Sequence, residues 1–303
     1  AAMIKALLEG EEVHLCVRDH EVEAHAHHVL REAGADSTHV HYHHIPTNDS
    51  WIRDHGPIMV KNVAREPHLI ALDWGFNSWG GKYPHDLDEK VGQRAAEELG
   101  LLCVDTEMIL EGGSIEVNGA GVLLTTESCL LNPNRNPELS RDQIEERLRE
   151  FLGVKKILWL GDGIAGDDTD GHIDDMTRFV GTNTLVTAVE KDPKDLNYRP
   201  LRDNRERLDR MTNLEGERFE VVELPMPEPV IDPEDGMRLP ASYANFYIGN
   251  AVVLLPVFGC AADKEAEGIL KELLPSRKIV PIKAKELILG QGACHCLTQQ
   301  IVR

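Results

Sequence analysis

The residues that could carry chemistry begin with a cysteine near the end of the chain. Cys296 lies within residues 290–300, shortly after Gly290 and Gly292. Glycines let the backbone turn tightly and approach a ligand closely, so a thiol at this position is predicted to face a pocket. Cysteine becomes a thiolate nucleophile when a cation or a base lies nearby. Because a lone cysteine in a turn is often structural, its interpretation depends on the residues that accompany it.

Carboxylates and a histidine occur in polar loops that open predicted hairpins. These residues are Asp49, Asp54, Glu111, His172 and Asp174. His172 and Asp174 are two positions apart, so on a strand both would point to the same face and toward one ligand. Carboxylates buried together repel one another unless a cation lies between them. A guanidinium suits such a site, because it is planar, pairs bidentately with carboxylates and has an electrophilic carbon that a thiolate can attack.

The residue pattern predicts that these loops open a repeated unit of two strands, a helix and a further strand. Hairpins are expected at Ile58–Val63 with Leu69–Trp74, Met108–Val117 with Gly121–Thr126, Ile173–Val180 with Thr184–Val189, and Ala241–Gly249 with Ala251–Val257. A fifth hairpin is expected near residue 295, in a terminal segment His295–Val302.

Helices are expected between these hairpins, at 1–9, 20–33, 88–99, 198–213 and 263–274 and after a capping box at Ser140-Arg141-Asp142-Gln143. Further strands are expected at 12–17, 38–45, 156–160, 219–224 and 278–282.

The predicted hairpins begin near residues 57, 113, 172, 242 and 295, at intervals of roughly 50 to 70 residues. A repeat of this size is typical of a propeller or an array of equivalent units. Five units around a central channel would point their opening loops at one axial site. The chain has no Gly-x-Gly-x-x-Gly between a strand and a helix, which argues against a dinucleotide-binding sheet. No linker divides the sequence, so residues 1–303 are expected to form one domain.

Composition excludes some functions. The chain has 52 Asp+Glu against 32 Lys+Arg, a formal charge of −20, which argues against a nucleic-acid partner and is compatible with a small cationic one. No apolar run approaches the roughly 18 residues of a membrane span, so no membrane partner is expected. Six cysteines in 303 residues are too few for a disulfide scaffold, and free thiols in a cytoplasmic protein are predicted.

Structural explanations remain open for each of these residues. The pair His172 and Asp174 could form a solvated turn or a core pair, and Glu111 could belong to a surface turn. Asp54 could form an exposed ion pair with Arg53, which would contribute little.

A metal site is a further alternative. Cys294 and Cys296 flank His295 and could bind zinc with His172 and Asp174, although no Cys-x-x-Cys spacing is present. The histidines at 25, 27, 28, 39, 41, 43 and 44 are expected to be surface or satisfied core residues.

Five motifs carry a resemblance to a known family. They are Asn48-Asp49-Ser50-Trp51-Ile52-Arg53-Asp54, Trp74-Gly75-Phe76-Asn77-Ser78-Trp79-Gly80-Gly81, Leu110-Glu111-Gly112-Gly113-Ser114, Gly171-His172-Ile173-Asp174 and His295-Cys296-Leu297-Thr298-Gln299-Gln300. Together they resemble the agmatine deiminase branch of the guanidino-group-modifying superfamily, which includes the porphyromonad-type peptidyl-arginine deiminases. The resemblance implies the pentein fold, a five-bladed α/β propeller built from ββαβ repeats.

The resemblance also implies residue roles. Cys296 matches the nucleophile and His172 the general acid/base. The other matched positions are Asp54 and Asp174 for gripping the guanidinium, Glu111 for supporting the imidazole and the substrate edge, Trp51 for lining the pocket, and Asp49 as a neighbour of Asp54.

The implied reaction is hydrolysis of agmatine to N-carbamoylputrescine and ammonia through a covalent amidino-cysteine, with no metal or organic cofactor. A deiminase of free or peptide C-terminal arginine, an amidinotransferase, a guanidine-binding module without catalysis and a zinc protein are the alternatives. A homodimer is compatible with an exposed unit of such a fold.

The sequence departs from the family pattern at two places. Gln291 replaces a glycine, and Ala293-Cys294 replace the usual Asn-Ile, so Cys294 is interpreted as a second, non-catalytic thiol. The family's tryptophan-containing segment does not precede Ala1, and the first blade is therefore expected to be incomplete.

Overall fold

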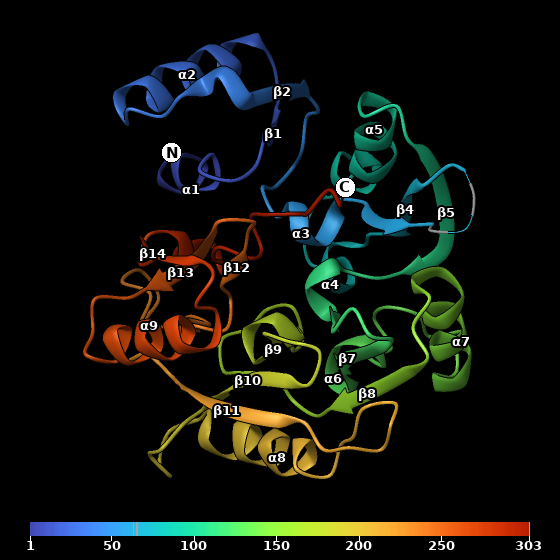
Figure 1. The fold of residues 1–303 in the computed structure, drawn as a ribbon, viewed down its shortest axis with the longest axis vertical. Coiled ribbons are helices and arrows are strands. Elements are labelled where there is room, and N and C mark those ends of the chain that lie inside the picture. The colour runs from blue at the N-terminus through green and yellow to red at the C-terminus, as the bar shows by residue number, and fades with distance from the viewer. Residues whose placement is uncertain (63, 65, 303) are drawn as a thin grey trace.

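The computed structural model describes residues 1–62, 64 and 66–302, which form five small sheets that follow one another around the molecule in chain order (Figure 1). Four sheets have three strands each. In these, the first two strands are antiparallel and the third is parallel to the second. A parallel pair needs a crossover connection, and a helix supplies it in each unit.

The first unit has only a parallel pair of strands. β1 (Val13–Val17) pairs with β2 (Val40–His44), and α2 (His20–Glu32) connects them. The side chain of Asp19 caps α2 by accepting hydrogen bonds from the backbone N–H groups of Glu21 and Val22. The short helix α1 (Ala2–Leu7) precedes β1.

The other units share the predicted order of hairpin, helix and strand. The second unit consists of α3 (Ile52–His55), β3 (Ile58–Lys61), β4 (Leu69–Gly75), α4 (Ser78–Gly81), α5 (Val91–Glu98) and β5 (Leu102–Ile109). The third consists of β6 (Glu116–Val117), β7 (Val122–Thr126), α6 (Glu127–Leu130), α7 (Arg141–Leu152) and β8 (Lys156–Leu160). The fourth consists of β9 (Thr177–Phe179), β10 (Thr184–Val189), α8 (Tyr198–Leu208) and β11 (Glu220–Pro225). The fifth consists of β12 (Tyr247–Ile248), β13 (Val252–Val257), α9 (Ala262–Leu273) and β14 (Lys278–Lys283).

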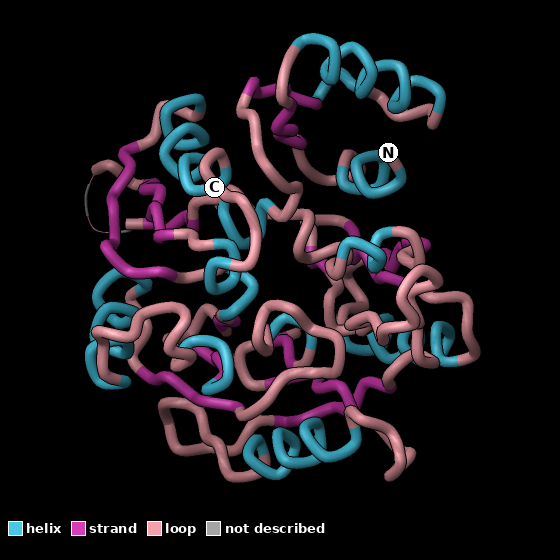
Figure 2. Tube along the Cα trace, turned by 180° about the vertical axis from the view of Figure 1, so that it is seen from behind, coloured by secondary structure: helices cyan, strands magenta, loops and turns pink. Residues whose placement is uncertain are grey.

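Helices α2, α5, α7 and α8 lie on the outer side of the molecule (Figure 2), where each has one apolar side to bury. On α7, Ile144 and Leu148 pack into the core beside Leu123, and solvent-facing residues are charged. Ser140 and Gln143 form the predicted capping box at the start of α7. The middle strands β7 and β13 are almost wholly buried, which explains their continuous apolar sequences.

The first four predicted hairpins are confirmed, with different bounds for several strands: β6 and β12 are much shorter than expected, β10 has the expected bounds, and β4 extends one residue further, to Gly75. Val63, at the end of the first, lies outside the described residues. The prediction for residues 295–302 was wrong, because no strand forms there. Instead the segment binds the α3 region: Arg53 Nη1 donates to Gln299 and Gln300, and Gln299 Nε2 donates to the carbonyl oxygen of Pro57.

The strand β5 was also missed. Only its last two residues were assigned to a strand, and they were placed in the following hairpin. The interruption of the apolar pattern by Asp105 and Glu107 explains the error, since both side chains are exposed.

The N-terminal segment packs against the last sheet. Ala6 and Leu7 join a buried cluster with Val252 and Leu254 of β13, and Lys278 Nζ lies 2.7 Å from an oxygen of Glu9. The first and fifth units are therefore neighbours in space, although they lie at opposite ends of the sequence (Figure 1). Among the described residues, no helix has the length and apolar character needed to cross a membrane.

Candidate functional site

The loops that open the units meet in the interior of the molecule. The N–H of Gly113, before β6, donates to Asp54 Oδ1 at 3.0 Å. His295 Nδ1 lies 2.6 Å from Asp174 Oδ2, and Asn245 Nδ2, before β12, donates to Asp175 Oδ1 at 3.0 Å. These bonds join loops from the second to the fifth units and the C-terminal segment, as the repeat pattern predicted.

The backbone at Gly113 lies very close to the side chains of three predicted site residues. A Cβ at this position would lie 2.6 Å from His172 Nδ1, 2.8 Å from Asp54 Oδ1 and 3.1 Å from Asp174 Oδ2. Real Cβ atoms do not tolerate contacts of this kind, so a residue without a side chain is required. Three of the predicted site residues therefore surround one small volume.

The thiol of Cys296 is buried beside these groups. Asn245 Nδ2 donates to its sulfur at 3.0 Å, and Asp174 Oδ2 is 3.9 Å from that sulfur. Burial raises the pKa of Cys296 well above its ordinary value, and the charges of Asp174, Asp175 and Asp54 raise it further. The thiol is therefore protonated at neutral pH in the ligand-free protein.

Asp54 and Asp174 are buried, and protein groups hold both carboxylates. Asp54 Oδ2 accepts a hydrogen bond from Trp79 Nε1 at 3.0 Å. Burial raises the pKa of Asp54, and the hydrogen bonds from Trp79 and Gly113 partly offset that rise. For Asp174, burial and the neighbouring Asp54 raise the pKa well above the usual range. A cation placed between the two carboxylates would stabilise their ionised forms.

His172 and Glu111 lie deeper, and both are fully buried. Glu111 Oε1 accepts from Arg135 Nε at 2.5 Å, whereas Glu111 Oε2 and both ring nitrogens of His172 have no hydrogen-bond partner among the described residues. Burial lowers the pKa of His172, so the imidazole is neutral at pH 7. Glu111, Cys129 and His172 each have one potential metal-ligand atom, and these three atoms lie within 4.8 Å of one another.

A cavity of about 200 Å³ leads to the sulfur of Cys296. Its described lining residues are Asp49, Trp51, Asp54, Trp79, Tyr83, Asp168, Thr169, Leu289, Gly290, Gln291, Gly292 and Cys296. The indole of Trp51 packs against the glycine segment so closely that a Cβ on Gly292 would lie 2.4 Å from the ring. The glycines near Cys296 therefore form a flat backbone wall opposite an aromatic side chain.

The outer part of the cavity is acidic. Asp49, Asp54 and Asp168 are the charged residues among the described lining residues, and no lysine or arginine lines the cavity in this part of the chain. Tyr83 Oη donates to Asp168 Oδ2 at 2.6 Å, and Lys82 Nζ lies 3.3 Å from Asp168 Oδ1. Such a cavity favours a cationic ligand over an anionic one.

The structure thus brings all the predicted site residues to one region. Cys296, Asp54, Trp51 and Asp49 line the cavity, and His172, Asp174 and Glu111 are buried next to it. The argument that placed His172 and Asp174 on one face of a strand was wrong, because residues 173–175 form a turn of 3-10 helix before β9.

Three alternatives are also corrected. Glu111 is not in a surface turn, since it is fully buried. Asp54 and Arg53 do not form an exposed ion pair, because both are buried and Arg53 binds the C-terminal segment. Cys294 packs among Tyr247, Val252 and Leu254, in a different cluster from Cys296, so the two thiols do not share one site.

Some site residues were missed from the sequence. Asn245 and Asp175 contact the reacting region, and Trp79 holds Asp54. Asn245 occupies the loop that opens the fifth unit, the same place as the recognised residues in theirs, and this position was the available signal. Residues 74–85 provide Trp79 and Tyr83 to the cavity, whereas no residue of 225–245 is among its described lining residues.

Comparison with known proteins assigns the chain to a class of hydrolases, the deiminases that act on C–N bonds of guanidino groups. The model of the Porphyromonas-type peptidyl-arginine deiminase family matches residues 1–301. The chain belongs to that family.

Similar proteins cover nearly the whole chain. A Selenomonas ruminantium protein provisionally named agmatine deiminase is 38% identical over 322 residues, covering 99% of this chain and 85% of its own. The agmatine deiminase of Enterococcus faecalis matches with a TM-score of 0.89 and 32% identity, covering 98% of this chain and 85% of that one. A cysteine-to-serine variant of C. jejuni agmatine deiminase with substrate bound matches with a TM-score of 0.86 and 35% identity, covering 97% and 83%.

We predict that Gly113→Ala lowers kcat/KM for ammonia release from a guanidino substrate by about 100-fold, since a shift of reacting groups by roughly 1 Å costs about that much. The added Cβ would displace His172 or Asp54. Gly268→Ala is the matched control, because nothing lies within 4 Å of its Cβ position. Equal activity of the two variants would contradict the proposed crowding at Gly113.

Proposed function

We propose that the protein is an agmatine deiminase that hydrolyses the guanidinium of agmatine to N-carbamoylputrescine and ammonia. The observation that carries this proposal is a group of buried polar atoms beside Cys296 that have no partner among the described residues: Glu111 Oε2, Asp174 Oδ1 and the ring nitrogens of His172. Each such atom costs roughly 1–3 kcal/mol when left unsatisfied. The N–H groups of a guanidinium would satisfy the carboxylate oxygens. The names of the relatives support the same substrate.

The acidic outer cavity supports agmatine over arginine. Agmatine carries an ammonium at its far end, and Asp49 and Asp168 line the cavity there. Free arginine and a C-terminal arginyl peptide would present a carboxylate to this surface, without a lining lysine or arginine among the described residues to pair with it. Trp51 and Trp79 add aromatic faces that attract a cation.

The high thiol pKa suggests that the substrate activates its own nucleophile. When the guanidinium binds beside Asp54 and Asp174, its positive charge offsets the carboxylates that hold the Cys296 proton. In this scheme the neutral imidazole of His172 accepts that proton; its Nδ1 lies 3.7 Å from Asp54 Oδ1, one of the carboxylate oxygens proposed to hold the guanidinium. The Asn245 amide donates to the sulfur and so stabilises the thiolate.

The proposed steps then balance. The Cys296 thiolate attacks the guanidinium carbon, and a C–N bond breaks as His172 returns the proton to the departing ammonia. A water molecule, deprotonated by His172, attacks the amidino carbon, and the C–S bond breaks to regenerate the thiol and imidazole. The net reaction consumes one water and releases one ammonia. In this scheme Asp54 and Asp174 grip the guanidinium and Glu111 supports the imidazole.

Deimination of free or peptide C-terminal arginine is the second candidate, because the family description names peptidyl-arginine. Both reactions would use the same inner groups and differ only at the outer cavity. An amidinotransferase would need an amine to replace water in the second step, and its product would reveal it.

We also propose that the five sheets are the blades of a five-bladed propeller of the pentein type, in one catalytic domain. The packing of α1 on the last sheet supports closure. Six free cysteines support a reducing cytoplasmic location, where the product would feed putrescine formation.

The proposal predicts that the purified protein releases ammonia from agmatine with kcat/KM at least about 30-fold above that for arginine or a peptide with C-terminal arginine, since an uncompensated charge costs roughly 2–5 kcal/mol. Ammonia release across this panel is the measurement. Preference for an arginine substrate would favour the second candidate, and release from none of them would refute deimination.

Replacing Cys296 and replacing Cys294 should have different effects on turnover. Cys296→Ala is expected to abolish turnover and the covalent adduct, which mass spectrometry of the acid-quenched protein would detect on wild type. Cys294→Ala should keep most activity, because Cys294 packs in a separate buried cluster with Val252 and Leu254 and does not line the cavity. If only the Cys294 variant lost activity, Cys294 rather than Cys296 would be the nucleophile.

Asp174→Asn is predicted to abolish turnover while accelerating alkylation of Cys296 by iodoacetamide. The thiol pKa is raised, so the thiolate fraction grows about tenfold for each pH unit below it, and removing the Asp174 charge shifts the alkylation profile to lower pH. Alkylation rates between pH 6 and 10 test this, with Asp203→Asn on the exposed side of α8 as control. An unchanged or upward-shifted profile would contradict the proposed role of this carboxylate.

A further inference from the structure

Histidines gather on one face of the two-stranded sheet, away from the cavity. Side chains alternate along a strand, so His14 and Cys16 point to the same side of β1, and Glu12, just before the strand, lies beside His14 and His41. In the parallel register His14 is opposite His41, and Cys16 is opposite His43. This face therefore carries three imidazoles, a carboxylate and a thiol that the proposed reaction does not use.

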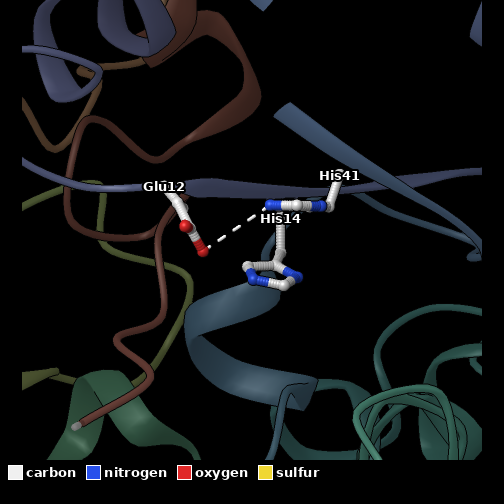
Figure 3. Close-up of side chains that lie close together, drawn as sticks. All are labelled: Glu12, His14 and His41. Carbon is white, nitrogen blue, oxygen red and sulfur yellow. Dashed lines mark ion pairs between the residues drawn. The ribbon is translucent and has the colours of Figure 1, made fainter. Parts of the chain in front are cut away.

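Three of these residues have metal-ligand geometry. One ligand atom each of Glu12, His14 and His41 lie within 4.8 Å of one another, and Figure 3 shows the three side chains grouped together. His41 Nε2 lies 3.6 Å from Glu12 Oε2, and their side chains are 47% and 36% exposed. The rings of His14 and His41 are stacked, with centroids 4.8 Å apart. A metal ion from solvent can therefore reach all three ligands.

A second tier of hydrogen bonds orients the central histidine. His14 Nδ1 lies 2.8 Å from His43 Nε2, and His43 Nδ1 lies 3.3 Å from Glu98 Oε2 on α5. With a carboxylate at the end of the chain, each Nδ1 is the donor, which gives His14 Nε2 the lone pair that a ligand requires. Metal-bound histidines commonly have such a carboxylate–histidine support.

We propose that Glu12, His14 and His41 bind a divalent transition-metal ion of the Zn²⁺ class, with water completing the coordination. Two imidazoles and one carboxylate are a ligand set that Zn²⁺ accepts. Cys16 is not part of this group, because its sulfur is not among the ligand atoms that lie within 4.8 Å of one another. The ion would fasten β1 to β2 and, through His43 and Glu98, to the second unit.

The test is calorimetric titration of Zn²⁺ into the chelator-treated full chain. The wild type and Cys296→Ala are compared, because the variant removes any Zn²⁺ binding at the Cys296 thiol. One equivalent should bind the Cys296→Ala protein and raise its Tm. Glu12→Gln and His41→Ala in that background should abolish this equivalent, and the conservative Glu12→Gln leaves the fold intact. His43→Ala should weaken binding about 10- to 100-fold.

His25→Ala is the matched control, since His25 is an exposed histidine of α2 outside the group. A Co²⁺ derivative should show no thiolate-to-metal charge-transfer band. Absence of Zn²⁺ uptake, uptake unaffected by Glu12→Gln and His41→Ala, or a thiolate band would each overturn the proposal. So would loss of the equivalent only in His44→Ala, which belongs to a separate group with His20 and Glu23.

Discussion

The mutual repulsion of buried carboxylates is the constraint on which the centre of this protein depends. Asp54, Asp174 and Asp175 are all buried, and the charge of each raises the pKa of the Cys296 thiol. Such an arrangement is unfavourable on its own. A cation of matching shape bound between the carboxylates would offset their repulsion. The charges of the site therefore favour a cationic substrate.

Buried arginines beside the site hold the carboxylate loops in place and compensate part of their charge. Arg135, of the third unit, binds Glu111 and reaches Asp170 in the loop of the fourth. Arg178, on β9, pairs with Glu116 of the third unit and donates to the carbonyl oxygens of Ala244 and Phe246 before β12. Each guanidinium thus connects neighbouring units from a buried position.

The sequence predicted the repeated architecture because each unit contains its own turn signals and buried strands. It also selected candidate site residues that the structure brings to one region, since they occupy the same loop position in successive units. The geometry that makes them a site could not be read in this way. Nothing local to Asn245 indicates that its amide donates to a sulfur 51 residues later, and nothing local to Arg135 shows that it is fully buried against Glu111. These contacts depend on how units pack, which period and composition do not specify.

The terminal segment illustrates the same limit. Residues 295–302 were expected to form a strand, but Gln299 and Gln300 are used as hydrogen-bond acceptors for Arg53. A buried guanidinium needs several acceptors, and this need outweighs local strand preference.

The protonated state of Cys296 affects how readily peroxide oxidises this residue. Peroxide attacks thiolates, and conversion to sulfinic or sulfonic acid is largely irreversible. The proposed nucleophile, Cys296, is kept as a thiol by burial and its acidic neighbours and is therefore less exposed to this damage when no substrate is bound. Exposure to oxidants is then limited to the short interval in which a bound cation has released the proton.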